Sequence, residues 1–143
     1  MNVLLSLETH LKLAGLVLLI LAFAHLFFEK RFGWKEEFAS LSPFNRQMFY
    51  VHNFFIMLVI ALCGALSLFG TESMLEKSAL GRYVAGGILF FWACPWVSQF
   101  FVYDSALWRG KVFETRVHIA FSLFWTYLVA VYGWNFWRQI SAP

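Results

Sequence analysis

Four long apolar segments constrain the fold of this sequence more than any other feature. They cover approximately residues 13–28, 48–69, 83–103 and 117–137. At about 1.5 Å of rise per residue, a helix of this length nearly or fully crosses the hydrocarbon core of a bilayer. The chain is 13% charged and its mean hydropathy is +0.67, whereas soluble domains carry about 25% charged residues. The sequence therefore predicts an integral membrane protein.

The connections between the segments are short, which favours antiparallel neighbours. We therefore predict an all-α integral membrane protein, an up-down four-transmembrane-helix bundle that forms a single domain over residues 1–143. In the first connection, Trp34 to Leu41 has apolar and charged faces, as expected of a short interfacial helix. Ser42 and then Pro43 form a typical helix start, so the second helix should begin near Pro43.

The first segment has a second interpretation, because Ala22-Phe23-Ala24 resembles the cleavage site of a secretory signal peptide. Signal peptides carry basic residues ahead of the apolar run, and none precedes Lys12. We therefore interpret the segment as a membrane span. Gly15 lies on the same helical stripe as His25, and small residues mark the side on which membrane helices approach closely. His25 is therefore expected to face other helices.

Basic residues are distributed unequally over the two sides of the predicted bundle. Residues 29–47 and 104–116 hold seven Lys and Arg, and the other side holds four. Because cytoplasmic loops are enriched in basic residues, both connections should lie in the cytoplasm and both termini outside, as in a bacterial inner (plasma) membrane protein. The first set is Lys30, Arg31, Lys35, Arg46, Arg109, Lys111 and Arg116, and the second is Lys12, Lys77, Arg82 and Arg138.

The net charge excludes one class of partner. A formal charge of +3, with no stretch that alternates basic and aromatic residues, argues against nucleic acid. Basic loops beside anionic headgroups account for this charge. The expected partners are the lipid bilayer and either other membrane subunits or further copies of the chain.

Polar and ionisable side chains gather at one end of the predicted bundle. Two Glu–His pairs lie there one helical turn apart, namely His25 with Glu29 and Glu114 with His118. An ionisable group inside a span is costly unless it is paired, hydrated or ligated, so this distribution indicates a site. His10 lies outside this level and is expected at headgroup depth without a partner. The other members are His52, Asn53, Gln99, Tyr103 and Asp104.

Imidazole and carboxylate groups together suit iron, zinc or copper, and helix bundles build metal sites from inward-facing Glu and His. We therefore predict a metal site near the cytoplasmic interface with His25, His52 and His118 as ligands. Hydrogen bonds that orient these ligands are expected from Asn53, Gln99 and Asp104.

Such a site beside acyl chains predicts metal-assisted oxidation or hydrolysis of a lipid or quinone, with the metal as Lewis acid or oxygen activator. In this metal-dependent oxidoreductase or hydrolase, Glu29 or Glu114 would serve as a further ligand or as general base. Tyr103 would serve as proton donor.

Two alternatives belong to other functional classes. Two of the histidines would suffice for a b-type haem, with Arg31, Arg46 or Arg116 on its propionates, in an electron carrier or the membrane anchor of a redox enzyme. The carboxylates would then be unexplained. The chain would otherwise be a non-catalytic accessory subunit of a larger membrane complex, in which the polar cluster is only a hydrogen-bonded interface. A proton pathway is weaker, because the other half of the bundle offers no ionisable relay.

Overall fold

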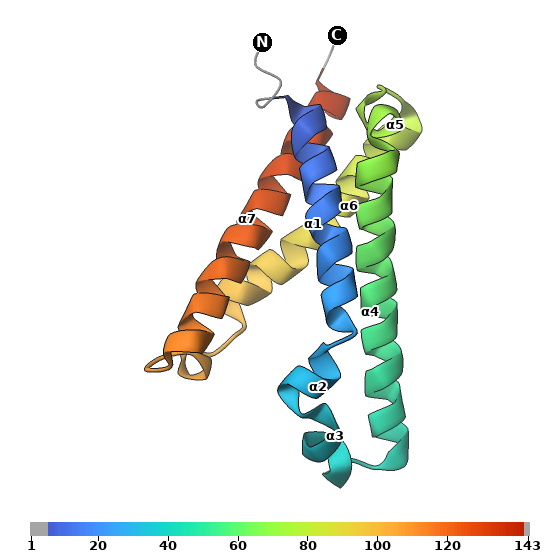
Figure 1. Cartoon of the computed structure of the whole chain (residues 1–143). Coiled ribbons are helices and arrows are strands. Elements are labelled where there is room, and N and C mark those ends of the chain that lie inside the picture. The colour runs from blue at the N-terminus through green and yellow to red at the C-terminus, as the bar shows by residue number, and fades with distance from the viewer. Residues whose placement is uncertain (1–5, 142–143) are drawn as a thin grey trace. The chain divides into compact units, whose positions relative to one another are not determined.

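The computed structural model describes residues 6–141, and all regular elements in that range are helices (Figure 1). Four of these helices are long: α1 (Leu7–His25), α4 (Pro43–Phe69), α6 (Ala79–Phe101) and α7 (Val112–Ile140). Each is long and apolar enough to cross a membrane by length and composition. The predictions of an all-α fold and of four candidate membrane spans are confirmed.

The connections contain short helices. Between α1 and α4 lie α2 (Phe28–Phe32), α3 (Trp34–Glu37) and the 3-10 turn η2 (Phe38–Ser40). Gly33 separates α2 from α3 with a φ of 63°, a left-handed conformation that side-chain-bearing residues rarely adopt. The later connections contain α5 (Thr71–Leu75) and the 3-10 turn η3 (Ser105–Leu107).

Side-chain caps fix the starts of two long helices. The Ser42 hydroxyl accepts a hydrogen bond from the Asn45 amide at 3.3 Å, and α4 begins at Pro43 as predicted. The Ser78 hydroxyl accepts from the Gly81 amide at 2.9 Å in the same way. With this cap, α6 begins at Ala79, four residues before residue 83, where the predicted apolar segment begins.

The end of α1 differs from the sequence prediction. The apolar segment continues to Phe28, but the helix ends at His25. The amides of Leu26 and Phe27 bond to carbonyls three residues back, at 3.2 and 3.0 Å, so the last turn tightens and the chain leaves the helix. Glu29 therefore belongs to α2 rather than to the same helix as His25.

The chain divides into two compact units. The α6–α7 unit consists of Met1–Leu11 and Glu72–Pro143, and the α1–α4 unit consists of Lys12–Thr71.

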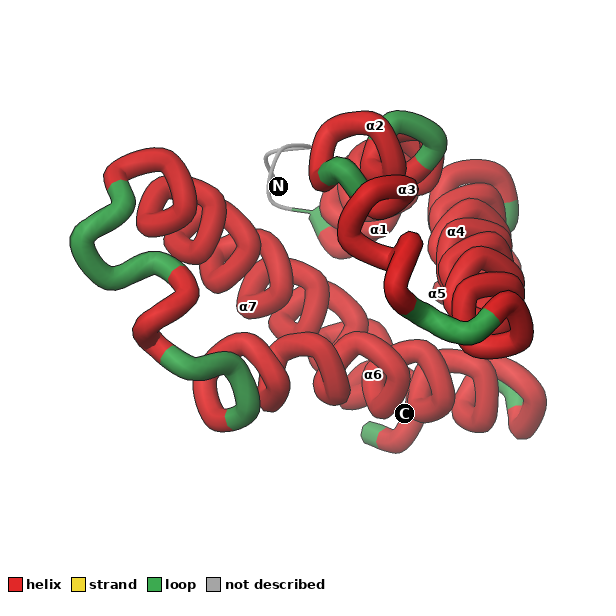
Figure 2. Tube along the Cα trace, turned by 90° about the horizontal axis from the view of Figure 1, so that it is seen from below, coloured by secondary structure: helices red, strands yellow, loops and turns green. Residues whose placement is uncertain are grey.

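In the α6–α7 unit, α6 and α7 form an antiparallel pair (Figure 2). A β-carbon on Gly86 would lie 3.1 Å from the Phe136 ring, which shows how closely the two helices approach there. Further along, the Trp92 and Trp125 rings are stacked with centroids 5.6 Å apart. Most of the buried apolar side chains of these two helices form this interior, namely Ala85, Ile88, Trp92, Leu128, Val131 and Tyr132.

Gln139 connects the end of α7 to the segment that precedes α6. Its side-chain nitrogen donates to the carbonyls of Met74 and Glu76, both at 2.8 Å. Its side-chain oxygen accepts from the Ser78 amide at 3.4 Å. The buried amide thus satisfies backbone groups that no helix satisfies.

In the α1–α4 unit, the two long helices approach closely at Gly15 and Gly64. A β-carbon on Gly15 would lie 2.7 Å from the Gly64 carbonyl oxygen and 2.6 Å from the Leu68 amide nitrogen. Only glycine permits this contact, which confirms that the Gly15 side of α1 meets another helix. His25, on the same stripe, is half-buried.

An aromatic cluster joins the first connection to the start of α4. The Phe49 ring lies 4.9 Å from Trp34 and 4.4 Å from Phe38, measured between centroids. Aromatic pairs at these distances stabilise beyond their buried area. The cluster holds α3 and η2 against the first turns of α4.

Candidate functional site

The predicted site residues divide between the two units. The α1–α4 unit contains His25, Glu29, His52 and Asn53, and the α6–α7 unit contains Gln99, Tyr103, Asp104, Glu114 and His118. Among residues 6–141, no group of three or more His, Cys, Asp or Glu side chains has an arrangement that could hold a metal ion. The geometry of each unit therefore decides what its histidines can do.

His118 lies in the second turn of α7, one turn after the exposed Glu114. The Gln99 side-chain nitrogen donates to His118 Nδ1 at 2.6 Å and to the His118 carbonyl at 3.4 Å. Because Nδ1 accepts a hydrogen bond, a neutral His118 carries its proton on Nε2. Gln99 is buried, so this bond lies in the interior of the α6–α7 pair.

Trp108 covers one face of the His118 ring. The two rings are stacked with centroids 3.8 Å apart and an interplanar angle of 10°. Trp108 follows η3, in which the Asp104 carboxylate accepts from the Ala106 amide at 2.8 Å. Asp104 therefore caps η3, and Tyr103 is exposed. The sequence did not indicate that Trp108 would contact a histidine.

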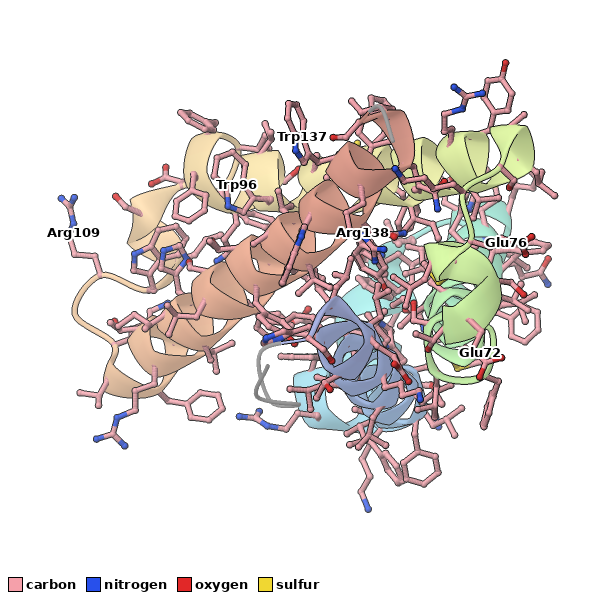
Figure 3. All side chains as sticks on the ribbon, turned by 90° about the horizontal axis from the view of Figure 1, so that it is seen from above. Glu72, Glu76, Trp96, Arg109, Trp137 and Arg138 are labelled. Atoms are coloured by element: carbon pink, nitrogen blue, oxygen red, sulfur yellow. The ribbon has the colours of Figure 1, made fainter. Side chains whose placement is uncertain are left out.

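A second hydrogen bond crosses between α6 and α7, three residues before Gln99 on α6 and eight residues after His118 on α7. The Trp96 indole donates to the Thr126 hydroxyl at 3.0 Å, and Figure 3 shows the Trp96 side chain between the two helices. The Arg109 side chain extends from the connecting loop, away from both helices (Figure 3).

His25 and His52 share one arrangement in the α1–α4 unit. His25 Nδ1 lies 2.8 Å from the Leu21 carbonyl oxygen, and His52 Nδ1 lies 2.7 Å from the Met48 carbonyl oxygen. A carbonyl only accepts, so Nδ1 carries the proton in both rings. Nε2 of each neutral ring is then left with a free lone pair, which is the group that binds metal. His118 has the opposite tautomer.

A hydrogen bond between Glu29 and Tyr50 joins α2 to the first turns of α4. The Tyr50 hydroxyl donates to the Glu29 carboxylate at 3.1 Å. His25 lies four residues before Glu29, and His52 lies two residues after Tyr50. Both histidines therefore lie within four residues of this Glu29–Tyr50 pair in the sequence.

His10 was predicted to have no partner, and this prediction is wrong. His10 Nδ1 lies 3.1 Å from the Tyr127 hydroxyl, and the His10 ring packs near the Trp134 ring. His10 and Tyr127 are 117 residues apart in the sequence, so no local sequence pattern indicates their contact. His10 is thus part of the packing of the α6–α7 unit.

Comparisons with protein-family models, with curated proteins and with solved structures find no match for this chain.

Proposed function

We propose that this membrane protein binds a transition-metal ion through Nε2 of His25 and Nε2 of His52. The observation that supports this proposal is the tautomer that the two rings share. In metal-binding histidines the other ring nitrogen commonly donates to a backbone carbonyl or carboxylate, which fixes the ring and raises the basicity of the ligand atom. His25 and His52 both have such a bond.

The ligand types favour zinc, iron or copper over calcium or magnesium, because imidazole suits the former group. Glu29, four residues after His25, is the candidate carboxylate ligand, and it would leave Tyr50 in order to bind. Two or three protein ligands leave coordination positions open to water or substrate, as in catalytic sites. When bound, the metal would supply a Lewis acid or oxygen activator.

The proposed substrate is a lipid or quinone, since the histidines lie near the ends of apolar helices that face acyl chains. This two-histidine site lies within the α1–α4 unit, so Glu114, Tyr103 and His118 of the other unit are given no role in it. Nε2 of a neutral His118 carries the proton and is a hydrogen-bond donor.

We also propose an up-down arrangement of the four spans in a bacterial inner membrane, with α2 and α3 at the cytoplasmic interface and both termini outside. The seven basic residues in residues 29–47 and 104–116, against four elsewhere, support this orientation.

A b-type haem is a second candidate cofactor. Two axial imidazoles suffice for it, and the α1–α4 unit offers two histidines with free Nε2 lone pairs. Arg31 and Arg46 in the same unit are candidate partners for the propionates.

The test is elemental analysis with an absorption spectrum of protein purified in detergent without chelator. Stoichiometric metal that is lost in His25→Ala and in His52→Ala, but retained in the control His10→Ala, would support the proposal. A Soret band lost in the same two variants would identify haem. A metal-free, colourless protein would contradict both and favour the accessory-subunit interpretation.

A further inference from the structure

Asn135 is an unpaired amide in the interior of the α6–α7 unit. Its side chain is only 1% exposed. Among the residues that the structure describes, neither its side-chain oxygen nor its side-chain nitrogen has a hydrogen-bond partner. Asn135 lies in α7, on the stripe that also carries the fully buried Leu128 and the buried Val131.

The neighbouring amide on the same stripe behaves differently. Gln139, one turn further along α7, is buried and has three hydrogen-bond partners in the chain. The helix therefore places two amides in its buried face, and the fold supplies backbone partners to only one of them. Within the described residues, the chain itself thus provides hydrogen-bond partners for Gln139 but not for Asn135.

An amide that is removed from water without a partner is strongly destabilising, and the penalty is largest in an apolar interior. Such groups in native proteins usually bind an ordered water, which makes about three hydrogen bonds. One water can accept a hydrogen bond from the Asn135 nitrogen or donate one to its oxygen. Trp92 is a second buried donor without a partner in the same helix pair.

We infer that Asn135 binds an ordered water inside the α6–α7 pair. The water is a structural ligand of this pair, separate from His118 at the other end of α7. The Asn135 side chain offers one uncharged donor group and one uncharged acceptor, which favours a neutral ligand. Both atoms have almost no accessible area, which favours a small one. A charged or larger ligand does not match these features.

The direct test is NMR on protein labelled with ¹⁵N-asparagine in detergent micelles, with the Asn135 side-chain signal assigned by its loss in Asn135→Leu. We expect a cross-relaxation peak of the Asn135 side-chain NH₂ group with water whose sign identifies a long-lived bound molecule rather than proton exchange. An Asn135 signal without this peak would overturn the inference.

Thermal unfolding gives a second test, because the direction in which Asn135→Leu changes Tm depends on whether a water is bound. If water is bound, Asn135→Leu removes its hydrogen bonds and should lower Tm by about 2–4 °C. If the amide is dry, the same substitution removes an unpaired polar group and should raise Tm, which would contradict the inference. Gln139→Leu is the matched control, because it removes three observed bonds and should lower Tm in either case.

Discussion

Gln99 donates to Nδ1 of His118 at 2.6 Å, and this bond gives His118 the imidazole tautomer opposite to that of His25 and His52. The three histidines that the sequence groups together are therefore not chemically equivalent. His25 and His52 have free Nε2 lone pairs, whereas Nε2 of His118 is a donor. The proposed function depends on this difference, and it can be tested in several ways.

Gln99→Met should destabilise the α6–α7 pair. The variant keeps the side-chain volume but leaves Nδ1 of His118 without its donor, at a cost of about 1–3 kcal/mol. The His118 carbonyl keeps the bond that it accepts from the Ser122 hydroxyl. Denaturant unfolding in detergent would measure the loss. Gln47→Met is the control, because Gln47 is exposed at the start of α4. Equal stability of the two variants would show that the Gln99 bond does not hold α6 to α7.

Gly15→Ala should force α1 and α4 apart. The new methyl group would meet backbone atoms of Gly64 and Leu68 below 3.0 Å, and such overpacking costs about 1–3 kcal/mol. Gly87→Ala tests the same substitution where nothing lies within 4 Å, and it should stabilise α6 by about 0.5–1 kcal/mol. Thermal unfolding of both variants gives the comparison. A harmless Gly15→Ala would refute the close contact.

Trp96 and Thr126 should be energetically coupled. Their 3.0 Å hydrogen bond joins α6 to α7, and bonds between membrane helices contribute about 0.6 kcal/mol on average and up to about 1.7 kcal/mol. A double-mutant cycle with Trp96→Phe and Thr126→Val measures this coupling directly. Strictly additive effects of the two substitutions would mean that the bond contributes nothing.

Much of the fold could be predicted from the sequence, because length, hydropathy and capping are local properties. The four long helices and the α4 start at Pro43 follow from them. The end of α1 at His25 could not be predicted, since the apolar residues continue past the point where the helix closes with tighter bonds. The Ser78 cap was present in the sequence but lies before the apolar run that defined the segment.

The candidate site was less predictable. Residue types and helical spacing identified His25, His52 and His118, but the proton positions depend on contacts that spacing does not contain. Gln99 reaches His118 only because α6 and α7 pair in one register, and Trp108 covers the same ring from a loop. The division of these residues between two compact units is likewise a tertiary property.

The most direct test of the central claim is a two-dimensional ¹H–¹⁵N spectrum of the imidazole nitrogens, recorded before and after addition of zinc. Before zinc, Nε2 should be unprotonated in His25 and His52, and Nδ1 should be unprotonated in His118. On addition of zinc, the Nε2 signals of His25 and His52 should shift together at stoichiometric metal while His10 stays unchanged. Unshifted His25 and His52 signals at saturating zinc would contradict the proposed metal site.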